Sequence, residues 1–63
     1  MDHRVRRAAS EYALAYADVQ RALAEFELED TTQVASRLAR NLDMVCIRGR
    51  EMKDALRAQI MGQ

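Results

Sequence analysis

The sequence predicts an all-α fold, a two-helix antiparallel hairpin that dimerises into a four-helix bundle or joins a larger assembly. Three observations support this. The chain has no proline and only two glycines, helix-favouring residues dominate it, and its apolar residues recur at spacings of three and four. No stretch alternates long enough to indicate a strand. We therefore expect a single domain over residues 1–63, with a helix at about 2–28, a turn at about 29–31 and a helix at about 32–60.

The first predicted helix begins at Asp2, whose side chain can cap it. Seven apolar residues with heptad spacing form what we call the first stripe: Val5, Ala9, Tyr12, Tyr16, Val19, Leu23 and Phe26. Ala8, Ala15 and Ala22 recur beside this stripe, one in each heptad. Small side chains in register allow a second helix to approach more closely than the usual separation of about 8–10 Å, so we expect close packing there.

The predicted turn lies in an acidic segment without glycine or proline, so one long continuous helix is the alternative to a hairpin. Asp30 or Thr31 can cap the second helix, and Gln33 follows Asp30 at the spacing of a capping box. Four carboxylates gather here, and carboxylates stabilise the start of a helix rather than its end. They therefore favour the hairpin: Glu25, Glu27, Glu29 and Asp30.

The second predicted helix carries its own heptad row, which we call the second stripe: Ala35, Leu38, Leu42, Val45, Gly49, Met52 and Leu56. Gly49 lies on this stripe. It is expected either to admit the first helix closely, opposite Ala8 and Ala9, or to mark a kink, because glycine inside a helix costs about 1 kcal/mol relative to alanine.

The length of the chain limits its stability. A domain of 63 residues buries only about 60% of its unfolded surface, and its core rarely contributes more than about 3–5 kcal/mol. The single cysteine, Cys46, excludes an internal disulfide, and the single histidine, His3, excludes a Cys/His metal site. Self-association is the remaining source of stability, so we expect a homodimer or a larger assembly.

The ten basic and ten acidic residues cancel, so the net charge gives no reason to expect a nucleic-acid or membrane partner. A hairpin nevertheless places the acidic turn at one end and five cations at the open end: Arg4, Arg6, Arg7, Lys53 and Arg57. Two such rods would pair antiparallel, because each acidic tip then meets a basic end. The same cations are the contacts that we expect if the partner is a nucleic acid instead.

The sequence gives no indication of catalysis. It lacks a Gly-rich phosphate loop, zinc-ligand spacing and a nucleophile motif, so we expect neither enzymatic activity nor a cofactor. Cys46 is expected to be a small buried apolar side chain, with a disulfide across a dimer axis as the alternative. Tyr12, Tyr16 and Phe26 lie in the first stripe and are expected in the core rather than stacked on bases.

Among the apolar residues off both stripes, we single out four on the outer sides of the helices and call them the outer residues: Leu14, Met44, Ile47 and Met61. The segment 44–47 is apolar on every side, which indicates burial all round, and a lone two-helix hairpin cannot provide that. The outer residues are therefore expected to dock a second protein or further copies of the chain. Methionines suit such a surface because they adapt to varied partners.

No apolar run approaches the ~18 residues of a membrane-spanning helix, and the first residues do not lead into the apolar core of a signal peptide. With a single thiol, the expected location is the cytoplasm. In length and helix pattern alone the chain is similar to several unrelated groups of bacterial and phage helical hairpins. These are plasmid copy-number regulators that bind paired RNA, co-chaperones and needle subunits of type III secretion, and phage inhibitors of host factors. Needle subunits usually carry a proline in the turn, which this chain lacks, and no functional residue is carried over from any group.

The sequence thus predicts a non-enzymatic protein–protein interaction module, acting as an adaptor, co-chaperone or inhibitor. A nucleic-acid-binding bundle that uses the basic open end is the first alternative. A structural subunit of a helical filament or ring is the second.

Overall fold

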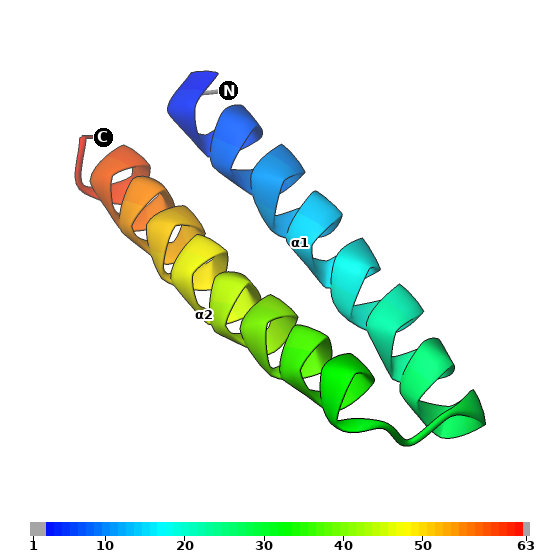
Figure 1. Ribbon diagram of the computed structural model, residues 1–63. Coiled ribbons are helices and arrows are strands. Elements are labelled where there is room, and N and C mark those ends of the chain that lie inside the picture. Colours follow the sequence, from blue (N-terminus) through cyan, green and yellow to red (C-terminus); the bar gives the residue numbers. More distant parts are fainter. Residues whose placement is uncertain (1–2, 63) are drawn as a thin grey trace.

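The computed structural model describes residues 3–62, which form two helices joined by a short turn. Helix α1 spans His3–Leu28 and helix α2 spans Thr32–Met61, and no strand occurs within residues 3–62. The helices lie side by side and run in opposite directions, so the start of α1 and the end of α2 lie at the same end (Figure 1). The predicted helical hairpin is confirmed, and the alternative of one continuous helix is wrong. The cap predicted at Asp2 lies outside the described residues.

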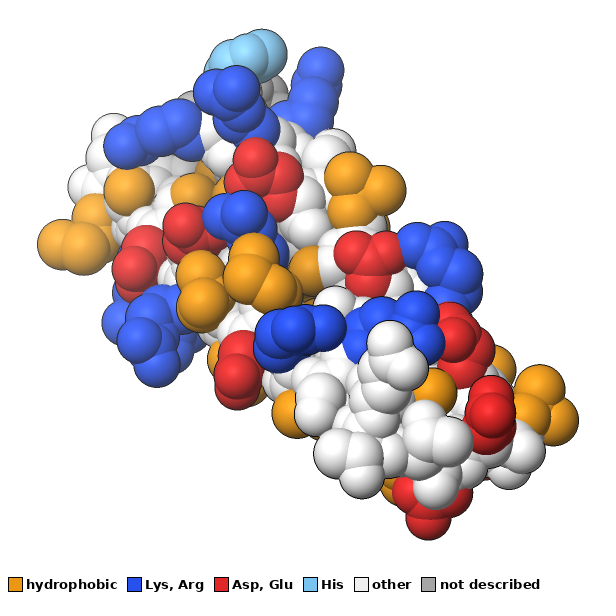
Figure 2. Space-filling model, viewed as in Figure 1, with side chains coloured by type: hydrophobic (Ala, Val, Ile, Leu, Met, Phe, Trp, Pro, Cys, Tyr) orange, Lys and Arg blue, Asp and Glu red, His pale blue; other side chains and the backbone are white. Residues whose placement is uncertain are grey.

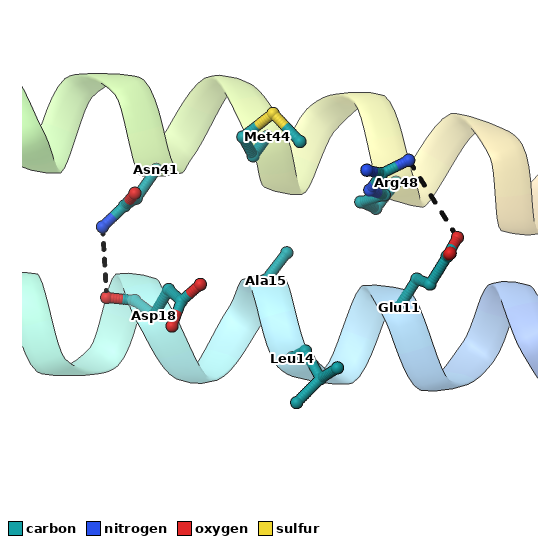
Figure 3. A pocket seen from close by; sticks show the side chains of 7 residues that line it. All are labelled: Glu11, Leu14, Ala15, Asp18, Asn41, Met44 and Arg48. Carbon is teal, nitrogen blue, oxygen red and sulfur yellow. Dashed lines mark hydrogen bonds and ion pairs between the residues drawn. The ribbon is translucent and has the colours of Figure 1, made fainter.

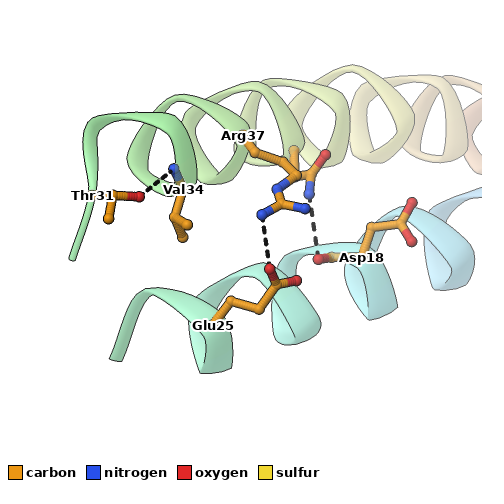
Figure 4. Close-up of polar contacts among 6 residues, drawn as sticks. Asp18, Glu25, Thr31, Val34 and Arg37 are labelled. Atoms are coloured by element: carbon orange, nitrogen blue, oxygen red, sulfur yellow. Dashed lines mark hydrogen bonds and ion pairs between the residues drawn. The ribbon is translucent and has the colours of Figure 1, made fainter. Parts of the chain in front are cut away.

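Thr31 ends the turn and caps α2. Its backbone is extended, with φ −108° and ψ 159°, and its hydroxyl accepts a hydrogen bond from the backbone N–H of Val34 at 3.2 Å (Figure 4). Of the two predicted caps, the chain therefore uses Thr31 rather than Asp30. The third residue of α2 is then Val34. The predicted capping box through Gln33 is wrong, because that motif needs Glu or Gln at the third position.

An ion pair joins the helices close to the turn. The guanidinium of Arg37 in α2 donates to Glu25 Oε2 at 2.7 Å (Figure 4). Glu25 lies in the last turn of α1, which has no basic residue of its own, so Arg37 supplies the positive charge that a helix end favours. Both side chains are about half exposed, so the pair contributes at most about 1 kcal/mol.

The helices meet along the alanines of α1 rather than along the whole first stripe. Ala15 and Ala22 are buried, Ala22 with only 2% of its surface exposed, and Ala8 is half-buried. Tyr16 and Leu23 are exposed, Tyr16 by 49%. The remaining large members of the stripe lie nearer the contact, one buried and three half-buried: Val5, Tyr12, Val19 and Phe26. The alanines, predicted to lie beside the first stripe and to pack closely against the second helix, do lie in the contact.

Helix α2 is likewise rotated about its axis, so that part of the second stripe faces outward. Five members of the second stripe are half-buried: Ala35, Leu38, Val45, Gly49 and Met52. Leu42 and Leu56 are exposed, while buried Val34 and half-buried Asn41, Arg48 and Ala55 form a heptad row of their own. The prediction that each stripe forms the contact as a whole is therefore wrong. On each helix the stripe and the row beside it occupy three heptad positions, and one neighbouring helix covers only two of them.

Gly49 makes room for an aromatic ring. A Cβ atom at this position would lie 3.2 Å from Cε1 of Tyr12, and the Tyr12 ring is 6.2 Å from that of Tyr16. Gly49 thus lies against Tyr12, which is one helical turn from the predicted neighbours Ala8 and Ala9. Helix α2 continues through this position without interruption from Thr32 to Met61.

The alanine contact leads to a first prediction. Replacing Ala22 by leucine should destabilise the hairpin by about 1–3 kcal/mol, because the added atoms have no space between the helices. Replacing the exposed Ala24 by leucine should change stability by less than about 0.5 kcal/mol. Urea unfolding followed by circular dichroism measures both. Equal effects of the two substitutions would contradict the packing described.

The Tyr12–Gly49 contact leads to a second prediction. Gly49→Ala should stabilise α2 by less than the roughly 1 kcal/mol expected in a helix, because the new Cβ atom must displace the Tyr12 ring. In a Tyr12→Ala background the full gain should appear. The free energies of unfolding of the four proteins form a double-mutant cycle that isolates this contact. The same gain in both backgrounds would show that the ring does not restrain position 49.

Candidate protein-interaction surfaces

The two long faces of the hairpin differ in chemistry. Each helix has one row of residues at heptad spacing in the contact: the alanine row of α1 (Ala8, Ala15, Ala22) and the row Val34, Asn41, Arg48, Ala55 of α2. Successive helical residues turn by about 100°, so in two antiparallel helices the residues directly after these two rows point to the same side. These residues are apolar, and we call the side on which they lie the apolar face: Ala9, Tyr16 and Leu23 from α1, with Ala35, Leu42, Gly49 and Leu56 from α2. The opposite side, which we call the charged face, carries the ion pairs between the helices.

The charged face contains an open hollow of about 220 Å³ between the helices (Figure 3). Acidic side chains of α1 and polar side chains of α2 line it, together with three apolar residues: Glu11, Leu14, Ala15, Asp18, Asn41, Met44 and Arg48. Asn41 donates from Nδ2 to the backbone carbonyl of Asp18 at 3.4 Å, and Arg48 lies 4.0 Å from a carboxylate oxygen of Glu11. The hollow thus combines apolar walls with charged groups of both signs.

Arg48 contacts carboxylates of both helices on this face. It donates to Glu51 Oε1 at 2.9 Å, one turn further along α2, and it also approaches Glu11 across the helix contact. The hydrogen bond to Glu51 and its charge raise the pKa of Arg48 above its ordinary value, with a smaller contribution from Glu11. The guanidinium is therefore held in place at the edge of the hollow.

The structure brings together two of the four outer residues. Leu14 and Met44 line the same hollow from opposite helices, and Leu14 is 68% exposed (Figure 3). Ile47 lies one turn beyond Met44 and is exposed, but it does not line the hollow. Met61, the last residue of α2, is 85% exposed at the open end. The hairpin alone does not bury any of the four.

The exposure of the Cys46 side chain differs from what we predicted. We expected a small buried side chain because residues 44–47 are all apolar, but the Cys46 side chain is exposed and its thiol is free. The reason is the rotation of α2, since only Val45 of this segment turns towards α1 and becomes half-buried. The segment is apolar all round without being buried all round.

Five of the ten basic residues lie together at the open end. Arg4, Arg6 and Arg7 begin α1, and Lys53 and Arg57 lie near the end of α2, so the antiparallel arrangement places all five on the same end (Figure 1). Figure 2 shows Lys and Arg side chains around this end and Asp and Glu side chains near the turn. Carboxylates also reach the basic end, because a second hollow contains Arg4 together with Glu11, Glu51 and Asp54.

Within residues 3–62, neither helix combines the length and the apolar character that crossing a membrane requires. The described residues also contain no group of three or more His, Cys, Asp or Glu side chains placed to hold a metal ion. In comparisons with known proteins, the chain matches no protein-family model, no curated protein and no solved structure.

The apolar face is the surface that sequence reasoning missed. Tyr16, Leu23, Leu42 and Leu56 were all expected in the contact between the helices, and all four are exposed. One signal in the sequence could have identified it. On each helix the stripe and the row beside it together occupy three heptad positions, and a single partner helix covers only two of them.

The exposure of Cys46 leads to a third prediction. The native protein should react with a thiol reagent at nearly the rate of the urea-unfolded chain, because the native fold does not shield the thiol. Following the released chromophore of Ellman's reagent with and without urea measures this. A reaction slowed by a factor of about 100 in the native protein would contradict the exposed position.

Proposed function

We propose that this chain is a non-enzymatic protein-interaction module, a small helical hairpin that self-associates and binds a second protein as an adaptor, co-chaperone or inhibitor. One observation carries the proposal. Among residues 3–62 only four side chains are buried, and two of them are alanines: Val5, Ala15, Ala22 and Val34. In the same range ten large apolar side chains are exposed. Contact with other protein surfaces would remove these side chains from water, at about 25 cal/mol per Å².

The surface that we propose for the second protein is the charged face with its neighbouring outer residues. Leu14 and Met44 offer apolar side chains at the edge of the hollow, and Ile47 extends the apolar area along α2. Met61 offers a further contact at the open end. Glu11, Asp18 and Arg48 would surround the apolar side chains of the hollow with charged groups, as in the polar rim of a protein interface. We propose a cytoplasmic location, because a free thiol suits a reducing compartment.

Nucleic-acid binding is the second candidate, and the gathering of five cations at the open end favours it. The carboxylates of Glu51 and Asp54 beside Arg4 oppose it, because they repel phosphates. Binding by the basic end would weaken steeply with salt, and removal of Arg6 and Lys53 would reduce that slope. Protein binding through the charged face would instead depend on Ile47.

A fourth prediction tests the proposed function. Ile47→Asp should abolish binding of the second protein, because a carboxylate would have to lose its water inside an apolar contact. Ser36→Asp, which adds the same charge at an exposed position of α2, should leave binding intact. Tagged wild-type protein and both variants are incubated with lysate of the source organism, and the bound proteins are identified by mass spectrometry.

The expected result is a protein in stoichiometric amount with the wild type and Ser36→Asp, and its loss with Ile47→Asp. If all three retain the same proteins, the proposed surface is wrong. Light scattering of the purified wild-type protein provides the complementary measurement. Large uniform assemblies without any partner would favour a structural subunit of a filament or ring over an adaptor.

A further inference from the structure

We propose that the apolar face is the surface through which two copies of this chain pair, antiparallel, into a four-helix bundle with Tyr16 at the two-fold axis. The inference rests on the proposed function only in that both require self-association. It adds the surface, the direction and the register of that association. It also separates the self-contact from the charged face, which we assign to a different protein.

The area of the hairpin fits one partner of this size. The chain exposes 5039 Å², whereas a compact monomer of its mass, 7.2 kDa, exposes about 4,100 Å². The excess of roughly 900 Å² matches the ~800 Å² that each partner buries in a standard protein interface. Both helices contribute large exposed side chains to the apolar face, namely Tyr16, Leu23, Leu42 and Leu56. A second copy would cover them along most of the rod.

The order of large and small residues suits an antiparallel copy. On α1 the face reads Ala9, Tyr16, Leu23, so an α1 in the opposite direction places Leu23 against Ala9 and Tyr16 against itself. A two-fold contact requires this self-complementarity, in which residue i meets j and j meets i. The arrangement alternates large and small side chains, and this allows facing layers to interdigitate.

The order of large and small residues on α2 also suits an antiparallel copy. Its part of the face reads Ala35, Leu42, Gly49, Leu56, so a reversed α2 places Leu42 against Gly49 and Leu56 against Ala35. The ring of Tyr12 lies over Gly49, which gives the incoming Leu42 an aromatic surface to rest on. Tyr12 and Tyr16, with ring centroids 6.2 Å apart, would meet the corresponding pair of the partner at the centre.

One axis serves both helices. The midpoint of the α1 set is Tyr16, and that of the α2 set lies between Val45 and Cys46. The contacts Asn41–Asp18 and Arg48–Glu11 fix how the helices are aligned, and they place these midpoints within one helical turn of each other, about 5.4 Å. A single two-fold axis perpendicular to the rod therefore satisfies α1 and α2 together.

The charges favour the same direction. Arg6 and Glu27 border the apolar face at opposite ends of α1, because Arg6 lies three residues before Ala9 and Glu27 lies four residues after Leu23. In the antiparallel pair Arg6 of each copy meets Glu27 of the other. In a pair with both turns at one end, the acidic turns would lie together and the basic ends would lie together, and like charges would repel. The polarity of the rod thus selects between the two arrangements.

The test of the surface uses sedimentation equilibrium of the purified protein. The wild type should sediment as a dimer, at about twice 7.2 kDa. Leu23→Glu and Leu42→Glu should each raise the dissociation constant at least about 100-fold, because each buries a carboxylate at the centre of the contact. Leu14→Glu, the same substitution on the charged face, should leave the dimer unchanged.

The test of the direction uses the native chain and needs no destabilising substitution. Cys46 lies on the edge of the apolar face, one turn from both Leu42 and Gly49 and close to the α2 midpoint. In the antiparallel dimer the two α2 helices are neighbours, so a short bis-maleimide should link Cys46 to Cys46. In a dimer with both turns at the same end, the two α2 helices lie diagonally opposite each other in the bundle, so the link cannot form. In Cys46→Ser/Ala39→Cys the thiols would lie about 20 Å apart along the antiparallel bundle and should not be linked.

Each outcome tests a different part of the inference. Dimer loss on Leu14→Glu, or an unchanged dimer with Leu23→Glu and Leu42→Glu, would overturn the inference and leave the proposed function standing. A dimer through the apolar face without a Cys46 link would overturn the antiparallel direction. A wild-type monomer at all concentrations would overturn both the inference and self-association, whereas the binding of a second protein is decided separately by the Ile47→Asp experiment.

Discussion

The close contact between α1 and α2 along Ala15 and Ala22 determines where every other apolar side chain lies. Two helices approach this closely only where the side chains between them are small, so α2 packs on the alanine edge of the first stripe. Tyr16 and Leu23, on the other edge, then face outward. The antiparallel direction turns Leu42 and Leu56 to the same side. A hairpin built on alanines is therefore a hairpin whose larger side chains are available for contacts outside it.

The local features could be predicted from the sequence because they depend on a few neighbouring residues. The two helices, the turn between them and Thr31 as a cap all belong to this class. The rotation of each helix could not be predicted, because α1 carries apolar or small residues at three heptad positions, and a second helix can pack on the Tyr16 side or on the Ala15 side. The positions of Cys46 and Arg48 follow from that rotation. One row at heptad spacing would have indicated the rotation of α2: Val34, Asn41, Arg48 and Ala55. Because two of its members are polar, this row is hard to recognise as part of the contact.

The two faces use different physics and therefore suit different contacts. On the charged face, Arg48 is held by Glu51 and Glu11, and Arg37 by Glu25, so the charges are largely matched within one chain. Such a surface offers direction and selectivity more than stability, because exposed ion pairs contribute little. The apolar face has no such partners within the chain, and its value lies in the area that it can remove from water. One small chain thus presents two separate surfaces without a second domain.

The turn of three residues, 29–31, explains how so small a contact between α1 and α2 can suffice. Two separate helices with this interface would have to find each other in solution and lose their independent motion, which costs several kcal/mol. Here a short tether holds α2 beside α1 at an effective concentration in the millimolar range, so closure is intramolecular and independent of how much protein is present. Thr31 and the Glu25–Arg37 pair close this tether at its end. Cleavage of the chain between Glu29 and Asp30 would leave every contact between the helices chemically intact and still separate the two halves on dilution.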